Sequence, residues 1–182
     1  FAVLDPLKPG CKYPFKYLSG AGVAFKLAQA VAALIGNQSL PMKYLDLVAM
    51  AGAADIVPLS DENRILVMYG LTLINRSPRP GLVALMKATR IEPGQLNAGQ
   101  IVFSIAPRIN AAGRLSDAKI AVELLMTDDL DRAIELSSQL ETENWERRKL
   151  DEETLNSALE KVVRVHDLDK DMALVLHEEE WH

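Results

Sequence analysis

The sequence predicts a mostly helical chain within an α/β fold. Apolar residues recur at spacings of three and four along most of its length, which is typical of amphipathic helices. Two short apolar runs, Phe1–Leu4 and Met172–Leu176, instead have the length of buried strands. No glycine or proline follows Thr127, so the C-terminal part of the chain is free to form one long helix.

The first helices are predicted from caps and apolar spacing. Ser19 is a suitable N-cap for a helix over Gly20–Ile35. The apolar run Tyr44–Ala54 fits either a buried helix or a strand, because its length does not decide between them. Asp61 is a suitable cap for a helix over Asp61–Arg76, where Glu62 favours the first turn.

Proline and glycine divide the next part of the chain. Breaks at Pro78–Gly81 and at Pro93-Gly94 leave a short helix over Gly81–Arg90 between them. The amphipathic segment Asn97–Ile105 follows the second break, and a later helix that ends at Met126 is expected, capped by Ser116 or Asp117.

The longest predicted element is a helix from Leu130 to Val165, capped by the preceding Thr127–Asp129. Both of its ends carry an apolar stripe, whereas its centre, Glu141–Glu153, is almost entirely charged. A helix that is polar on all sides in its middle is typical of a connection between domains. A coiled coil is the alternative, although the apolar heptads do not persist through the centre.

Composition limits the class of protein. At 182 residues, the chain is long for one domain and short for two, and 49% hydrophobic residues are enough for a core. The single cysteine, Cys11, excludes an internal disulfide and fits a reducing compartment, so we expect a cytoplasmic protein. Neither a signal peptide nor a membrane span is predicted.

The charge is distributed unevenly. A net charge of −5 argues against a simple basic nucleic-acid-binding protein. Residues 1–115, however, carry +6 and residues 116–182 carry −11, counted from the Lys, Arg, Asp and Glu in each part. The first part could therefore attract a polyanion, and the second could repel it or meet a basic partner.

The segment Ile105–Leu115 holds the strongest candidate for binding chemistry. It contains Arg108 and Arg114, six residues apart, with Asn110 between them and no carboxylate. The forked donors of arginine match pairs of phosphate oxygens. Pro107 favours an extended entry to the segment. From the residues alone, the segment is either a turn with solvated arginines or a cradle for a phosphodiester backbone.

A second candidate is Asp55, which closes an apolar run. A carboxylate buried at such a point needs an ion pair or a bound cation, because burial disfavours its charged form. The alternative interpretation is an aspartate that caps a helix or forms a turn. Asp46 lies inside the run and is interpreted as a helix-surface or capping residue.

Five blocks, in this order along the chain, resemble the RecJ family of the DHH phosphoesterase superfamily. They are Leu18–Lys26, Tyr44–Met50, Ala51–Leu59, Asp61–Arg64 and Pro107–Leu115. The resemblance implies a 5′-to-3′ exonuclease that acts on single-stranded DNA in repair and recombination and uses Mn²⁺ or Mg²⁺. It also implies that Asp55 is a catalytic metal ligand, and that Arg108, Asn110 and Arg114 bind nucleic acid. Ala51-Gly52 stands where the family usually has Gly-Thr.

The resemblance also implies three parts. Residues 1–127 would be the C-terminal part of a DHH domain, residues 128–166 a long connecting helix, and residues 167–182 the beginning of a DHHA1 domain. The three histidines, His166, His177 and His182, all lie near the C-terminus, so the family's Asp-His-His motif has no counterpart here. We therefore expect an excised piece that is inactive alone. The expected partner is single-stranded DNA, with a single-strand-binding protein or a helicase as further candidates.

Two other functions stay open at this point. One is a DHH-family phosphatase that acts on very short oligonucleotides, and the other is a non-catalytic DHH-fold scaffold in a replication complex. The presence of Asp55 and both arginines favours the nuclease, because a scaffold has no chemical need for them.

Overall fold

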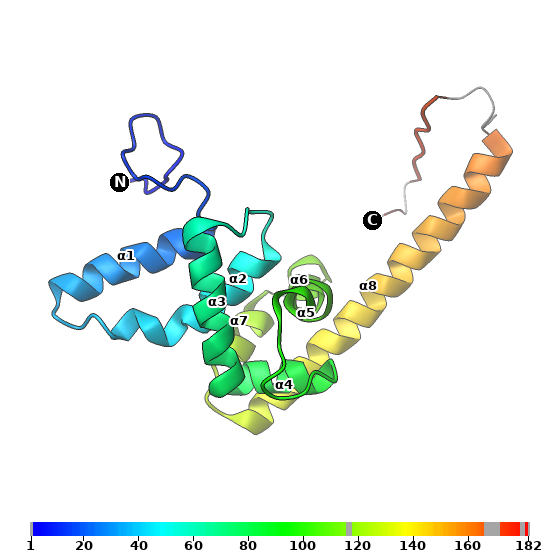
Figure 1. The fold of residues 1–182 in the computed structure, drawn as a ribbon. Coiled ribbons are helices and arrows are strands. Elements are labelled where there is room, and N and C mark those ends of the chain that lie inside the picture. Colours follow the sequence, from blue (N-terminus) through cyan, green and yellow to red (C-terminus); the bar gives the residue numbers. More distant parts are fainter. Residues whose placement is uncertain (1, 116–117, 166–171, 179–180, 182) are drawn as a thin grey trace.

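The computed structural model describes residues 2–115, 118–165, 172–178 and 181; the side chains of residues 114, 115 and 165 lie outside the described part. A helical body is followed by a long helix that extends away from it (Figure 1). The elements are α1 (Gly20–Leu34), η1 (Leu40–Tyr44), α2 (Leu45–Ala54), α3 (Asp61–Arg76), α4 (Pro80–Ala88), α5 (Ala98–Gln100), the π-helical η2 (Ile101–Ile105), α6 (Ala106–Leu115), α7 (Lys119–Met126) and α8 (Leu130–Val165).

The predicted mostly helical fold is confirmed, but both predicted strands are wrong within the described residues. Ala2–Leu4 forms an exposed loop, and Met172–Leu176 has no regular secondary structure. A strand satisfies its backbone N–H and C=O groups by pairing with a neighbour. No other strand occurs in residues 2–115, 118–165, 172–178 or 181 with which either run could pair.

The predicted start of α1 is confirmed. The Ser19 hydroxyl accepts a hydrogen bond from the Gly22 N–H at 3.1 Å, which satisfies one of the free donors of the first turn. The loop before α1 is tied to α3 by the Tyr13 hydroxyl, which donates to the Glu62 carboxylate at 2.7 Å. Burial, and then this hydrogen bond, raise the pKa of Tyr13 to about 12.

The segment Tyr44–Ala54, which fitted either a helix or a strand, is helical and mostly buried as α2. It crosses α3 closely at Gly70. A Cβ at this position would lie 2.3 Å from the Leu45 carbonyl oxygen and equally close to Ala49. Only glycine therefore allows α2 and α3 to pack at this distance.

The helix over Asp61–Arg76 has the predicted bounds, but its cap was assigned wrongly. Ser60 is the N-cap residue, and Asp61 is the first residue of α3 with φ of 43°. Asn63, one turn further on, is the buried anchor of this region. Its amide donates to the carbonyls of Tyr17 at 2.6 Å and Pro58 at 3.0 Å, and so holds the loop between α2 and α3.

The next helices follow the predicted breaks. Pro80 is the first residue of α4, a position where a missing N–H costs no hydrogen bond. Asn97 and Gln100 form a reciprocal capping box with two 3.0 Å hydrogen bonds. The predicted caps of α7, Ser116 and Asp117, lie outside the described residues, and Ala118 precedes the helix.

The main core includes buried residues of α2, α3, α4, η2, α6, α7 and α8, and within it α8 packs mainly on α4, α6 and α7. The predicted cap of α8 is confirmed, because the Asp129 carboxylate accepts from the N–H groups of Asp131 and Arg132 at 2.9 and 3.2 Å. The buried side chains of α8 lie in its first half, and the second half projects beyond the body (Figure 1). No helix in the described part is long and apolar enough to cross a membrane.

Candidate nucleic-acid interface and metal ligand

The segment predicted to be a turn-like cradle is a helix. Residues 106–115 form α6, which continues directly from the π-helical η2. Pro107 was expected to keep Ala106 out of a helix, and this expectation is wrong. A proline ring clashes with the carbonyl four residues earlier in an α-helix and lacks an N–H. The wider π-helical turn before it changes that register, so the helix passes through Pro107.

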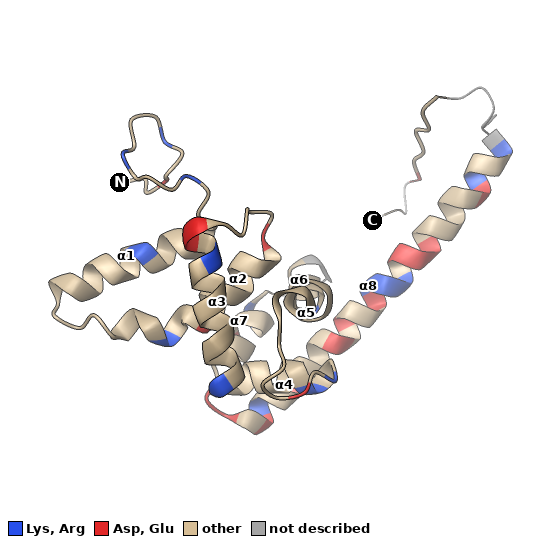
Figure 2. Cartoon of the chain, in the orientation of Figure 1, with Lys and Arg blue, Asp and Glu red and all other residues tan. Residues whose placement is uncertain are grey.

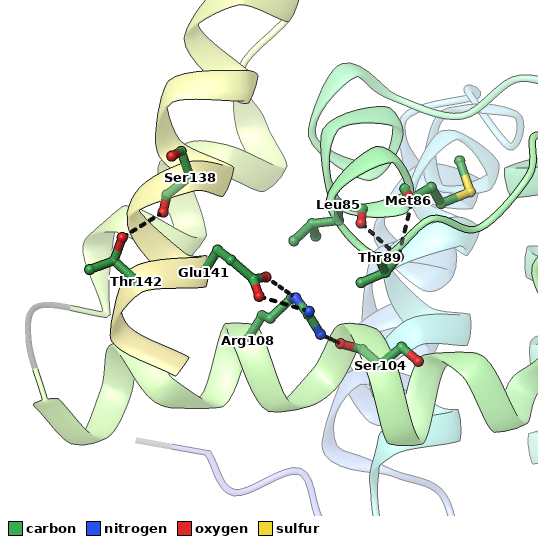
Figure 3. A network of polar contacts seen from close by, with 8 residues as sticks. All are labelled: Leu85, Met86, Thr89, Ser104, Arg108, Ser138, Glu141 and Thr142. Atoms are coloured by element: carbon green, nitrogen blue, oxygen red, sulfur yellow. Dashed lines mark hydrogen bonds and ion pairs between the residues drawn. The ribbon is translucent and has the colours of Figure 1, made fainter. Parts of the chain in front are cut away.

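Arg108 is engaged inside the molecule, between α6 and α8. Its Nε and Nη2 atoms donate to the two carboxylate oxygens of Glu141, and the Nη2–Oε1 distance is 3.0 Å. Its Nη1 atom donates to the Ser104 carbonyl at 2.6 Å, so all three nitrogens of the guanidinium are used (Figure 3). The Arg108 side chain is 11% exposed. Three of its five N–H donors are therefore already used, and the low exposure leaves little access for a phosphate in this conformation.

Asn110 and Asp55 line the same groove. The groove has a volume of about 730 Å³ and lies between α1, α2 and α6. Its walls are otherwise almost entirely apolar, with Phe25, Tyr44 and Met50 among the larger side chains. Both Asp55 and Asn110 are exposed. The structure thus brings together two predicted site residues that lie far apart in the sequence.

The third predicted contact, Arg114, lies near the end of α6, and its side chain is outside the described residues. Backbone position 114 is one turn beyond position 110, whereas position 108 is two residues before it. In an α-helix, residues four apart share a face, and residues two apart point to nearly opposite sides. By backbone position, 110 and 114 therefore share one side of α6, and 108 lies on another.

Asp55 is the C-cap residue of α2, and its Oδ1 atom accepts from the Ile56 N–H at 2.8 Å. The argument that it is a buried carboxylate in need of a cation is wrong, because the residue is exposed. Its apolar run is the helix itself, which ends just before the aspartate. Exposure still leaves the second carboxylate oxygen accessible from the groove.

The described residues do not complete a metal centre. No cluster of three or more His, Cys, Asp or Glu side chains that could hold a metal ion occurs among residues 2–115, 118–165, 172–178 and 181. Two metal ions held about 3.5–4 Å apart need several carboxylate or imidazole ligands. Asp55 alone fits one ligand of such a centre, and the others would have to come from elsewhere.

An ion pair behind the groove was missed at the level of the sequence. Asp46 was interpreted as a helix-surface or capping residue, but it is buried and bound by Arg79 at 2.6 and 2.8 Å. Arg79 also donates to the carbonyls of Leu125 at 2.8 Å and Lys43 at 3.3 Å. One guanidinium thus joins α2, η1, α7 and the start of α4. The two partners are 33 residues apart, so no local pattern in the sequence connects them.

Comparison with known proteins identifies the relatives of this chain. No family model matches it. The single-stranded-DNA-specific exonuclease RecJ of Bacillus subtilis is 42% identical over 181 residues, which cover 100% of this chain and 22% of the relative. RecJ of Escherichia coli is 34% identical over 195 residues, covering 100% of this chain and 34% of the relative. The chain thus spans about a fifth to a third of the curated relatives it matches.

Solved structures agree with the sequence comparison. A crystal structure of Thermus thermophilus RecJ in complex with Mg²⁺ has a TM-score of 0.73 and 40% identity, over 80% of this chain and 23% of that chain. A crystal structure of exonuclease RecJ bound to manganese has a TM-score of 0.75 and 39% identity, over 85% of this chain and 38% of that chain. The resemblance seen in the motifs is therefore confirmed, and this chain is similar, in sequence and in fold, to one part of the RecJ single-stranded-DNA-specific exonucleases.

Proposed function

We propose that this chain is part of a metal-dependent, RecJ-type exonuclease that hydrolyses single-stranded DNA from its 5′ end. The observation that carries the proposal is the groove between α1, α2 and α6. It combines an accessible carboxylate, Asp55, with an amide donor, Asn110, on a segment whose sequence resembles the family's DNA-contacting block.

Each groove residue has a proposed role. Asp55 would supply one oxygen ligand to Mn²⁺ or Mg²⁺, the ions bound in the solved RecJ structures. Asn110 would donate to a phosphate oxygen, and Arg114, one turn further along α6, would add a charged phosphate contact. When bound, the metal ions supply an activated water and charge stabilisation for phosphodiester hydrolysis. Arg108 would contribute least to direct contact with DNA, because Glu141 accepts two of its N–H donors and the Ser104 carbonyl a third.

The finer division of the chain is also a proposal. Residues 1–127 would be the C-terminal part of a DHH domain, residues 128–166 its connecting helix and residues 167–182 the beginning of a DHHA1 domain. Support comes from α8, whose second half projects from the body and is polar on most sides (Figures 1 and 2). A single-strand-binding protein or a helicase remains a candidate partner that delivers the DNA.

The metal role is tested by Asp55→Ala in a RecJ-length protein that contains this sequence. Mn²⁺-dependent release of nucleotides from 5′-labelled single strands should be lost, while circular dichroism and the melting temperature stay unchanged, because Asp55 is exposed at a helix end. Asp61→Asn is the matched control, since it removes the charge of a nearby exposed carboxylate that does not line the groove, and asparagine tolerates the positive φ of this position. A near wild-type rate of nucleotide release for Asp55→Ala would contradict the role of Asp55 as a metal ligand.

DNA contact is tested by salt titration of single-strand binding. Loss of one phosphate contact should flatten the slope of log K against log salt by about 0.7. We expect this change for Arg114→Gln, and a weaker affinity with an unchanged slope for Asn110→Ala, which removes a neutral donor. Binding of strands from 2 to about 20 nucleotides also distinguishes an exonuclease from a phosphatase of very short oligonucleotides. An exonuclease should bind the longer strands more tightly, because non-specific binding follows the backbone over several nucleotides.

A further inference from the structure

We propose that Glu141 is a positioning residue for the groove. Its carboxylate would hold Arg108, and through Arg108 it would set the rotation of α6 on α8 and hence the place of Asn110. This inference rests on the proposed function, and it assigns the Arg108–Glu141 pair a role that differs from direct contact with DNA.

The first step is the geometry of the pair. Arg108 and Glu141 meet through two parallel hydrogen bonds, with Nη2–Oε1 at 3.0 Å, and the third nitrogen of Arg108 is held by the Ser104 carbonyl at 2.6 Å (Figure 3). Two parallel bonds fix direction as well as distance. The arginine is 11% exposed and the glutamate 43%, so the pair lies at the edge of the contact between the helices.

The second step is the rest of the contact between α6 and α8. Ala111 and Ala112 are fully buried on α6, and Ala133 and Leu140 are fully buried on α8. Small apolar side chains attract without direction and leave rotation weakly determined. Ser137 and Asn144 are also buried on α8, and their polar atoms have no hydrogen-bond partner in the described part of the chain. These two polar residues therefore add no directional contact, whereas the two parallel hydrogen bonds of Glu141 do.

The third step connects the pair to the groove. Arg108 and Asn110 are two residues apart in a helix, so their side chains leave α6 on nearly opposite sides. A rotation of α6 that followed loss of the pair would move Asn110, and with it the adjacent Ile109 and Ala106 in the groove wall. A displacement of about 1 Å is enough to disturb a site that depends on orientation. The position of Asn110 in the groove thus depends, through the Arg108–Glu141 pair, on the position of α8.

The opposite reading is that Arg108 binds phosphate once Glu141 releases it. The two interpretations predict opposite changes in DNA affinity. If Glu141 competes with phosphate, Glu141→Gln should tighten DNA binding. If Glu141 positions α6, the same change should weaken it.

The test is binding of a fluorescent oligothymidine to the 182-residue chain over a range of salt. We expect Glu141→Gln and Arg108→Gln each to weaken binding about five- to tenfold, the size of ordinary coupling between sites, with unchanged salt slopes. The double variant Arg108→Glu with Glu141→Arg should restore most of the affinity. Asp151→Asn is the matched control: it removes the same charge from the same helix, from an exposed 2.5 Å pair with Arg147, and should leave binding unchanged.

Tighter binding by Glu141→Gln, or a slope that Arg108→Gln flattens by about 0.7, would overturn the positioning role in favour of phosphate contact. If the wild-type chain does not bind the oligonucleotide, the proposed DNA contact fails on this chain, but the positioning role is still measurable. Spin labels at the exposed positions of Asn110→Cys and Gln139→Cys, in a Cys11→Ser background, report the distance across α6 and α8. Glu141→Gln should broaden or shift this distance, and an unchanged narrow distribution would refute the inference.

Discussion

The two halves of α8 form one continuous helix but lie in different environments. Between Leu130 and Asn144, the helix packs on α4, α6 and α7, and Leu136, Leu140 and Asn144 are almost fully buried. Beyond that point no described side chain is fully buried and most large apolar ones are exposed, with Trp145 at 62% and Val163 at 80%. The boundary between the packed and the projecting half lies within the charged centre expected from the sequence, because Glu141, the first residue of that centre, still contacts the body.

This difference shows that the two halves are stabilised by different forces. Burial of apolar area, which holds the first half, stabilises most helices in proteins. The second half relies on helix propensity, on charged pairs along its own surface such as Arg147–Asp151 and Lys149–Glu153, and near its end on contacts of Lys161 with the C-terminal segment. Figure 2 shows small groups of acidic and of basic residues along this projecting part. Such pairs each contribute only about 0.2–0.5 kcal/mol.

The largest expected effect is on amide hydrogen exchange. Amides in the first half of α8 should exchange only when the body unfolds, whereas those from Glu146 to Glu153 should exchange by local opening. We expect a difference of at least about a hundredfold in protection between the two halves. Exchange measured by mass spectrometry on overlapping peptides checks this. Uniformly slow exchange along the whole helix would indicate a packed dimer or coiled coil instead.

The second effect is on stability when one leucine is removed from each half. Leu140 is fully buried and Leu155 is 56% exposed. Leu140→Ala should lower the free energy of unfolding by about 2–5 kcal/mol, because it removes buried methyl groups and leaves a cavity. Leu155→Ala should change it by less than about 0.5 kcal/mol. Urea titrations followed by circular dichroism measure both, and equal losses would mean that the second half is also packed.

The third effect has the opposite sign. Asn144 is 1% exposed, and neither polar atom of its amide has a hydrogen-bond partner in the described residues. A buried polar group without a partner costs about 1–3 kcal/mol. Asn144→Leu, which has a similar volume, should therefore raise the free energy of unfolding by about that amount in the same urea titration. Gln139→Leu, at an exposed position on the same helix, is the control and should have little effect.

Much of the helical layout could be predicted, because the signals for it are local. The cap at Ser19 and the bounds of α3 and α8 agree with the structure. The helical state of residues 106–115 could not be predicted, because proline and glycine there suggest a turn. Packing of Ala111 and Ala112 against α8 outweighs that local preference.

The sequence named residues of the candidate site, but it could not predict how they are arranged. The shared groove of Asp55 and Asn110 joins α2 to α6, a contact that depends on the tertiary fold. The partners of Arg108 and Asp46 are each 33 residues away, so spacing in the sequence does not indicate them. An arginine or a carboxylate in the sequence indicates that an ion pair or a bound ligand is needed. Only the fold decides which of the two is present.

The smallest expected effect concerns the exposed ion pair Arg147–Asp151 of the projecting half, at 2.5 Å. Exposed pairs gain little, since water screens the charges and ordering two long side chains costs entropy. Asp151→Asn should therefore lower the free energy of unfolding by less than about 0.5 kcal/mol, and added salt should erase the difference. Glu141→Gln, which removes the same charge from a contact with the body, should cost more and keep part of its effect in salt, because the mostly buried Arg108 is left without a charged partner. Urea titrations of both variants at about 0.05 and 0.5 M salt measure the two losses of unfolding free energy. Charges are screened over about 14 Å at the lower salt concentration and about 4 Å at the higher one. Equal losses in the two variants would mean that the contact between α6 and α8 adds nothing beyond a surface ion pair.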